Sequence, residues 1–323
     1  LKRYLFVAAA VIVLFVISGL SYFFFRFPDI DSAPSLSIEK TPQRLERGRY
    51  LASNVSGCID CHSTRNWKYY AGPITKGTEG KGGELFDESI GIPGALYSAN
   101  ITPAGIGSLT DGELFRAITS GVTKDGRVLF PLMPYSRYNN MTDEDIYSII
   151  AYIRTFPAVE NNVAPSHVNF PVNYIIRTVP SPHRTQPEPN QNDPYEYGKY
   201  LVNAAACADC HTPQSNGKPI QGKEFAGGME FNMPQGLIRS ANITPDEETG
   251  IGNWSKEAFI ARFKSFAAPG AAQLSSDTMK SQTIMPWIFF SGMKEEDLGA
   301  IYTYLRTIQP VKNQVEHFTP PNK

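Results

Sequence analysis

The chain has 323 residues, with 30 basic and 31 acidic side chains and a formal net charge of −1. This balance offers no basic surface to a polyanion, so we expect no nucleic-acid partner. The length suits about two domains at roughly 150 residues each, and the 25 prolines and 26 glycines predict loop-rich ones.

An apolar segment lies at the N-terminal end. Residues 4–25 carry no charge, follow Lys2 and Arg3, and end in an aromatic run before Arg26. A helix of this length crosses a hydrocarbon core of roughly 30 Å, and the preceding basic residues favour a cytoplasmic N-terminus. We expect a single-pass anchor over 1–27 in a bacterial cytoplasmic membrane, a polar tether over 28–43, and the remaining domains on the periplasmic side. The alternative is a cleavable signal peptide, but the run is long for one and no clean small-x-small site follows.

The pentapeptide Cys-x-x-Cys-His occurs twice and uses all four cysteines. This spacing is typical of covalent c-type haem attachment. On a helix, residues at i, i+3 and i+4 share one face, so both thiols reach the vinyl groups of one porphyrin while the imidazole reaches its iron. We predict two covalently bound haem c groups, held by Cys58, Cys61 and His62 and by Cys207, Cys210 and His211.

Other interpretations of the cysteines are weaker. A four-cysteine zinc site would need both pairs to converge on one metal, although they lie 149 residues apart. A thioredoxin-like redox pair requires neither the following histidine nor a second copy. Disulfides within each pair would leave both histidines unexplained.

The two motifs lie in two copies of a longer repeat. Residues 47–51 match 197–201, Gly82 and Gly83 match Gly227 and Gly228, 98–103 recurs identically as 240–245, 132–135 matches 284–287, and 141–155 matches 293–307. We call 44–163 repeat one and 195–315 repeat two, and predict one domain for each. The spacer 164–194 contains seven prolines and reads as extended, but its apolar part, 168–176, is expected to pack along one or both domains. A tail, 316–323, follows.

Helices are the dominant expectation. Each repeat predicts an opening helix that carries the cysteines (44–61 in repeat one), a middle helix (110–120 and 256–266) and a last helix (142–155 and 294–307). The last helices begin with acidic residues, which suit a helix N-terminus. Because no strand alternation appears, we predict an all-α fold of two tandem cytochrome c-type domains plus one N-terminal transmembrane helix.

Matched methionines offer a sixth ligand for each iron. Met133 and Met285 precede a proline and an aromatic residue in a loop, and proline fixes the backbone there. Met141 and Met293 instead precede a helix N-terminus, where they would pack on Ile146 and Leu298 as hydrophobic staples. We therefore predict His62, Met133, His211 and Met285 as the iron ligands.

The remaining candidates are weaker. His167, His183 and His317 have no repeat partners and are expected to serve local packing or the surface. Met229, Met233 and Met279 occur only in repeat two. The recurrence of 98–103 as 240–245 predicts a structural loop beside the haem.

Each repeat carries the same ordered set of motifs: Cys-x-x-Cys-His, Ser-Ala-Asn-Ile-Thr-Pro, Met-Pro and the acidic start of the last helix. This set resembles the multihaem cytochrome c subunits of bacterial membrane-bound alcohol and gluconate dehydrogenases. The resemblance implies His/Met haems that relay electrons, and partners among the subunits of a dehydrogenase, respiratory complex or oxidase. It implies no catalytic residue in this chain. Those subunits typically carry three haem domains and often a C-terminal anchor, whereas two haem domains and an N-terminal anchor are expected here. The rival interpretation is a dihaem peroxidase with one open iron, against which the matched methionines argue.

Overall fold

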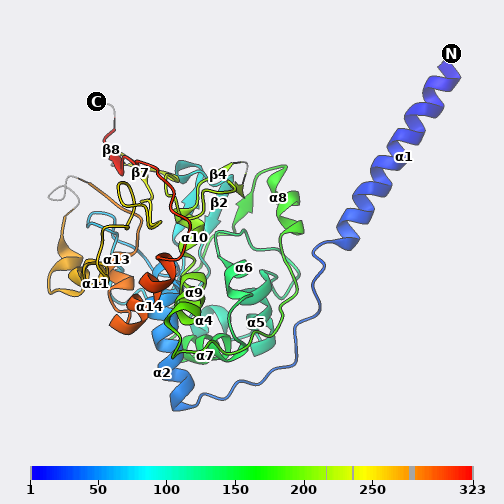
Figure 1. Cartoon of the computed structure of the whole chain (residues 1–323). Coiled ribbons are helices and arrows are strands. Elements are labelled where there is room, and N and C mark those ends of the chain that lie inside the picture. The colour runs from blue at the N-terminus through cyan, green and yellow to red at the C-terminus, as the bar shows by residue number, and fades with distance from the viewer. Residues whose placement is uncertain (1, 216, 235, 276–280, 322–323) are drawn as a thin grey trace.

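The structure is a computed structural model that describes residues 2–215, 217–234, 236–275 and 281–321. One helix, α1 (Lys2–Arg26), projects from a body formed by the two repeats (Figure 1). None of its residues is buried, and within the described residues it is the one helix long and apolar enough to cross a membrane. The predicted long apolar helix is therefore present.

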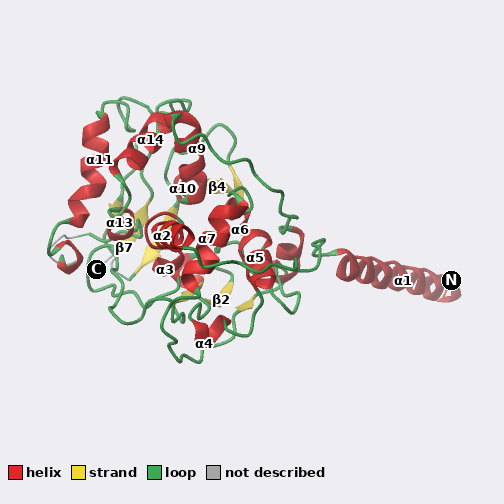
Figure 2. Cartoon of the chain, turned by 90° about the horizontal axis from the view of Figure 1, so that it is seen from below, coloured by secondary structure: helices red, strands yellow, loops and turns green. Residues whose placement is uncertain are grey.

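Corresponding elements recur in the two halves of the body (Figure 2). Repeat one and the following spacer contain α2 (Pro42–Tyr50), a π-helical turn η1 (Leu51–Val55), α3 (Cys58–Cys61), β1 (Leu85–Asp87), the 3-10 turn η2 (Glu88–Ile90), β2 (Gly94–Tyr97), α4 (Pro103–Ile106), α5 (Asp111–Ser120), α6 (Tyr135–Tyr138), α7 (Asp143–Ile153), β3 (His167–Val168), α8 (Val172–Ile175) and η3 (Ile176–Thr178). Repeat two and the tail contain α9 (Pro194–Ala204), α10 (Cys207–His211), β4 (Gln214–Ser215), β5 (Lys218–Pro219), β6 (Glu230–Met233), β7 (Gly236–Arg239), α11 (Lys256–Lys264), η4 (Ser265–Ala267), η5 (Ala271–Gln273), α13 (Trp287–Phe290), α14 (Glu295–Leu305) and β8 (Phe318–Thr319).

The prediction of one continuous opening helix over 44–61 is wrong. Gly57 has φ +66 and separates α3 from the helix before it. Repeat one also has one more residue here, because Cys58 follows Gly48 by ten positions whereas Cys207 follows Gly198 by nine. The π-helical turn η1 accommodates the extra residue, and Ser56 N–H donates to the Leu51 carbonyl at 2.8 Å, the i→i+5 pattern of a π turn.

The prediction of an all-α fold is also wrong in part, because the described residues form three small antiparallel sheets. Two are three-stranded, in the orders β1-β2-β3 and β6-β7-β8, and β4 pairs with β5 as a hairpin. These strands have two to four residues, which is too short for a period-two pattern to show in the sequence. Strands β3 and β8 come from the predicted spacer and tail.

The first and last helices of each repeat cross closely at a glycine. A Cβ at Gly48 of α2 would lie 1.9 Å from the carbonyl oxygen of Ser148 in α7, and one at Gly198 of α9 would lie 2.0 Å from that of Ala300 in α14. These distances explain why Gly stands in the recurrent sequence before each haem motif. The middle and last helices begin and end close to their predicted positions, with Thr110 and Thr142 as N-caps.

The two repeats meet through hydrogen bonds that are exchanged reciprocally. Tyr50 donates to Asp297 of repeat two at 2.5 Å, and its counterpart Tyr200 donates to Asp145 of repeat one at 2.5 Å. Asn54 donates to the Phe289 carbonyl at 3.1 Å, and Asn203 donates to the Arg137 carbonyl at 2.8 Å. Equivalent residues therefore make equivalent contacts, as in an isologous two-fold interface.

The spacer packs on repeat one, but its apolar stretch does so only in part, because Ile176 is buried whereas Phe170 and Ile175 are exposed. Strand β3 pairs with β2, and His183 hydrogen-bonds Asp143 at 2.7 Å while its ring lies edge-on to Phe115. The local packing role expected for His183 is confirmed.

Candidate haem sites

Both motif histidines are held in the same way. The Nδ1 atom of His62 lies 2.7 Å from the Ala99 carbonyl oxygen, and that of His211 lies 2.7 Å from the Ala241 carbonyl oxygen. A carbonyl only accepts, so Nδ1–H is the donor and Nε2 keeps its lone pair. A hydrogen bond of this kind fixes the tautomer and orientation of a metal-binding imidazole.

The carbonyl partner of each histidine is part of a rigid loop. Asn100 accepts hydrogen bonds from the amide and the hydroxyl of Thr102, at 2.9 and 2.7 Å, and donates to the Val159 carbonyl at 2.8 Å. Asn242 and Thr244 make the same bonds in repeat two, with the Val311 carbonyl as acceptor. The recurrent sequence therefore forms a structural loop, as predicted, and this loop contacts the motif histidine of each repeat.

A positive-φ glycine brings this loop to the histidine. Gly82 has φ +70, and its amide donates to the His62 carbonyl at 2.8 Å. A Cβ there would lie 2.4 Å from the carbonyl carbon of Ala99. Gly227 makes the same contacts with His211 and Ala241. The recurrent Gly-Gly pair was visible in the sequence, but its role required the tertiary structure.

The four cysteines are free, and their surroundings are alike. Burial raises the pKa of Cys58, Cys61 and Cys207 to about 12 and that of Cys210 to about 11. Protein atoms thus surround the thiols, although Cys61 and Cys210 remain accessible from solvent. Burial likewise lowers the pKa of both motif histidines, so each imidazole is neutral at pH 7 and able to bind a metal.

The methionines fall into two classes. Met141 and Met293 are completely buried with Ile146 and Leu298 in the main core, as expected of staples. Met133 and Met285 are partly buried at the edge of that core. Each stands in a tight turn, because its carbonyl accepts from the amide two residues later, at 2.7 and 2.8 Å. Met229 and Met233 lie in or beside β6, and Met279 lies outside the described residues.

The aspartate inside each motif has a different partner. Asp60 is buried and pairs with Arg65 of its own repeat at 3.0 Å. Asp209 pairs with Arg137 of the other repeat at 2.6 Å. Because Arg137 belongs to α6, the helix that follows Met133, the methionine turn of repeat one contacts the attachment helix of repeat two.

Tyr135, which follows Met133 and Pro134, carries a buried hydroxyl with no hydrogen-bond partner. The side chain is fully buried, and burial raises its pKa to about 12. A buried hydroxyl without a partner is rare in a folded protein. A haem placed against this turn would supply polar edge atoms for it.

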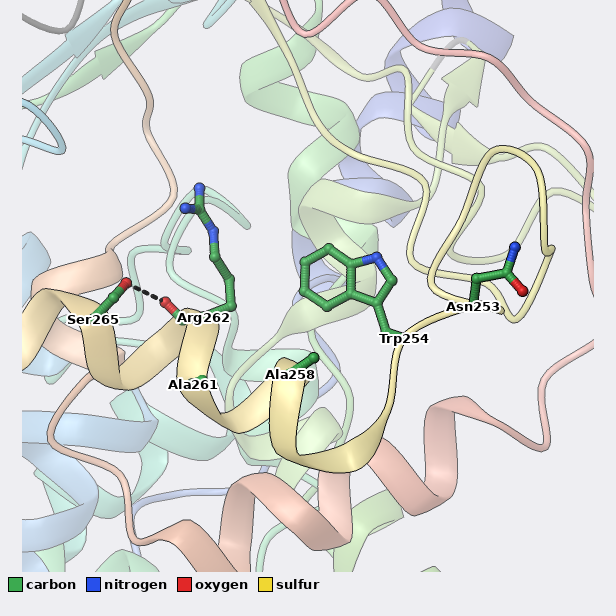
Figure 3. Close-up of a pocket in the computed structure, with 6 residues that line it drawn as sticks. All are labelled: Asn253, Trp254, Ala258, Ala261, Arg262 and Ser265. Carbon is green, nitrogen blue, oxygen red and sulfur yellow. Dashed lines mark hydrogen bonds between the residues drawn. The ribbon is translucent and has the colours of Figure 1, made fainter.

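A shallow hollow on the surface of repeat two lies apart from these residues. Figure 3 shows its lining on and before α11, with Trp254 and Arg262 projecting from one face. Arg262 also stacks on Trp287, 4.7 Å from the ring centroid. None of the lining residues belongs to the haem motifs or methionine turns, so the hollow is no part of either candidate site.

The sequence of the second repeat matches a known protein family. Residues 195–309 match the family described as Cytochrome c. The second repeat is a cytochrome c domain. Such a domain implies a covalently attached haem c, and the free thiols of Cys207 and Cys210 and the oriented, neutral imidazole of His211 fit that group.

Several relatives that match most of the chain are named as cytochromes or cytochrome subunits. It is 31% identical to the fructose dehydrogenase cytochrome subunit of Gluconobacter japonicus over 82% of this chain and 52% of the relative. It is 28% identical to the cytochrome c subunit of the quinone alcohol dehydrogenase of Gluconacetobacter polyoxogenes, over 90% of this chain and 59% of the relative. A diheme cytochrome c-type protein of Cereibacter sphaeroides is 25% identical over 80% of this chain and 84% of the relative. These relatives confirm the resemblance, and the chain spans about half the length of the two dehydrogenase subunits.

Proposed function

We propose that the chain is a membrane-anchored dihaem cytochrome c. It relays electrons between a membrane-bound dehydrogenase or respiratory complex and a downstream acceptor, and it carries no substrate chemistry of its own. The two haem domains lie on the periplasmic side of a bacterial cytoplasmic membrane, with α1 as the single span. The observation that supports this most directly is the repeated histidine setting, in which His62 and His211 are oriented by the same carbonyl contact.

Two covalent haem c groups would be held by the two Cys-x-x-Cys-His turns. His62 and Met133 would ligate one iron, and His211 and Met285 the other. Met/His ligation gives the high reduction potential that suits an electron carrier. Met133 and Met285 are only partly buried and stand in turns fixed by proline, which is consistent with this role. Met141 and Met293 are instead fully buried in the core.

The interface between the repeats supports a relay. Its reciprocal hydrogen bonds and the Arg137–Asp209 ion pair hold the two attachment helices in one arrangement. The Cys210 thiol lies close enough to Cys61 for its charge to contribute to the raised pKa of that residue. A fixed arrangement of two redox centres suits an electron relay, and a flexible tandem would lack it.

The relatives described above favour the relay over a dihaem peroxidase. Three are named as cytochrome subunits or a diheme cytochrome, and none of the three is named as a peroxidase. A peroxidase would also need one iron with an open position, and both repeats supply a matched methionine.

Visible spectra through a redox titration, with and without carbon monoxide, test the proposal on the full-length protein. We expect an intact mass with two haems and two low-spin centres that do not bind carbon monoxide. Met285→Ala should lower one potential and open one iron to carbon monoxide, whereas the matched control Met293→Ala should leave both spectra unchanged. Rapid carbon monoxide binding by the unsubstituted protein would refute the double His/Met ligation and favour the catalytic alternative.

A further inference from the structure

The tether between α1 and repeat one is docked along α5. The Ile38 amide donates to Asp111 at 2.8 Å, and Arg116 donates to the Asp31 carbonyl at 3.4 Å. Gly112 lies so close to the tether that a Cβ would be 1.7 Å from the Pro34 carbonyl oxygen. These contacts give repeat one a defined position with respect to the end of α1.

The spacer contacts the last turns of α1 directly. The Tyr174 ring of α8 packs edge-on against Phe24, with 5.6 Å between the ring centroids. Arg177 donates to the carbonyls of Phe24 and Phe27, and its guanidinium lies 5.4 Å from the Phe24 ring centroid. Figure 1 shows α8 on the side of the body that faces α1. Two segments about 150 residues apart in sequence therefore meet at the end of the membrane helix.

This contact region exposes large apolar side chains. Phe170 is 80% exposed, Ile175 57% and Val179 40%, which is unusual for residues of this size clustered within ten positions. Together with Tyr174 we call them the α8 patch. A clustered apolar surface of this kind marks an interaction site rather than ordinary surface.

The level of α8 relative to the bilayer indicates that lipid covers the α8 patch. The 25 residues of α1 span about 37 Å at 1.5 Å per residue, more than the roughly 30 Å hydrocarbon core. The last turn of α1, which contains Phe23 to Arg26, therefore lies at the headgroup level. Because Tyr174 touches Phe24, α8 lies at that level too, where aromatic residues are favoured.

We propose that the α8 patch inserts into the outer leaflet of the same bilayer that α1 spans, as a second membrane contact that holds repeat one against the surface. The inference rests on the proposed anchoring by α1. An apolar face of this kind buries only to the boundary between headgroups and acyl chains.

Spin labels on single introduced cysteines test the proposal in the full-length haem protein, because thioether bonds leave no native thiol to react. The variants are Phe170→Cys, with Val13→Cys in α1 as the lipid control and Ile220→Cys in repeat two as the water control. Ile175→Cys replaces the first variant if haem content shows that it misfolds. The purified chain is placed in vesicles of phosphatidylglycerol and phosphatidylcholine, and collisions with oxygen are compared with collisions with a water-soluble nickel chelate.

We expect the oxygen-to-nickel collision ratio at position 170 to lie several-fold above that at 220 and below that at 13. If the ratio at 170 equals that at 220 while 13 remains lipid-exposed, the α8 proposal is overturned and the anchor stands. If the label at 170 is shielded from both reagents, protein rather than lipid covers the patch, which also overturns the proposal. If position 13 itself gives an aqueous ratio, the anchoring proposal fails.

Discussion

Replacing Tyr50 by Phe removes a single buried hydroxyl from the interface between the repeats. Tyr50 donates to Asp297 at 2.5 Å, and within the described residues this is the one hydrogen bond that the Asp297 carboxylate receives. Both side chains are buried. A hydrogen bond to a charged group contributes about 1.5–3 kcal/mol, so Tyr50→Phe should destabilise the folded protein by about 2 kcal/mol and lower the first calorimetric transition by about 5 °C.

The pseudo-symmetric substitution Tyr200→Phe is the matched control. Its acceptor, Asp145, also receives two hydrogen bonds from Arg47, both at 2.8 Å. Each tyrosine hydroxyl accepts one backbone amide as well, so that loss is common to both variants. Tyr200→Phe should therefore cost about 1 kcal/mol or less, since the carboxylate keeps a charged partner.

The pH dependence follows from the direction of the Asp297 pKa. Burial raises this pKa, and the hydrogen bond from Tyr50 opposes the rise. Tyr50→Phe should therefore raise it further. A carboxyl group whose pKa is raised by folding adds stability below its unfolded pKa of about 3.9, and that stability is lost as pH increases through the folded value. The deficit of Tyr50→Phe should be full at pH 7 and shrink toward pH 4. Equal deficits in the two variants, or a deficit independent of pH, would refute this reasoning.

Three further substitutions separate the roles of neighbouring residues. Gly82→Ala should lower haem incorporation, and should lower stability by more than about 2 kcal/mol, since its Cβ would meet the Ala99 carbonyl. The control Gly77→Ala, also at positive φ but in open space, should cost about 1 kcal/mol. Similar haem yields from the two variants would contradict the role of Gly82 in bringing the Ala99 carbonyl to His62. Met141→Ala should lower the free energy of unfolding by about 2–5 kcal/mol by leaving a cavity in the core, which denaturant melts measure. Its visible spectra should stay unchanged, because Met141 is not expected to be an iron ligand. If haem accepts a hydrogen bond from the Tyr135 hydroxyl, Tyr135→Phe should destabilise the haem-loaded protein by about 1 kcal/mol. A calorimetric transition at or above that of the unsubstituted protein would show that the hydroxyl has no partner in the haem-loaded state.

The sequence by itself showed the two candidate haem-attachment motifs and the middle and last helices of each repeat. The spacing within Cys58–His62 and Cys207–His211 is local, so it is visible without a fold. The acidic first turns of α7 and α14 and the Thr142 cap of α7 are local too, and both helices form where they are expected. The staple methionines could be separated from the ligand candidates because position relative to a helix start is also a local property.

Only the tertiary structure decided what depends on contacts between distant residues. The short sheets form when β3 and β8 arrive from outside the repeats, and no periodicity in strands of two residues predicts that pairing. The carbonyls that orient His62 and His211 lie 37 and 30 positions away, and a backbone acceptor leaves no signature in residue type. Tyr50 and Tyr200 each donate a hydrogen bond to the other repeat. This contact likewise arises from packing one copy against the other, which the self-similarity of the sequence cannot reveal.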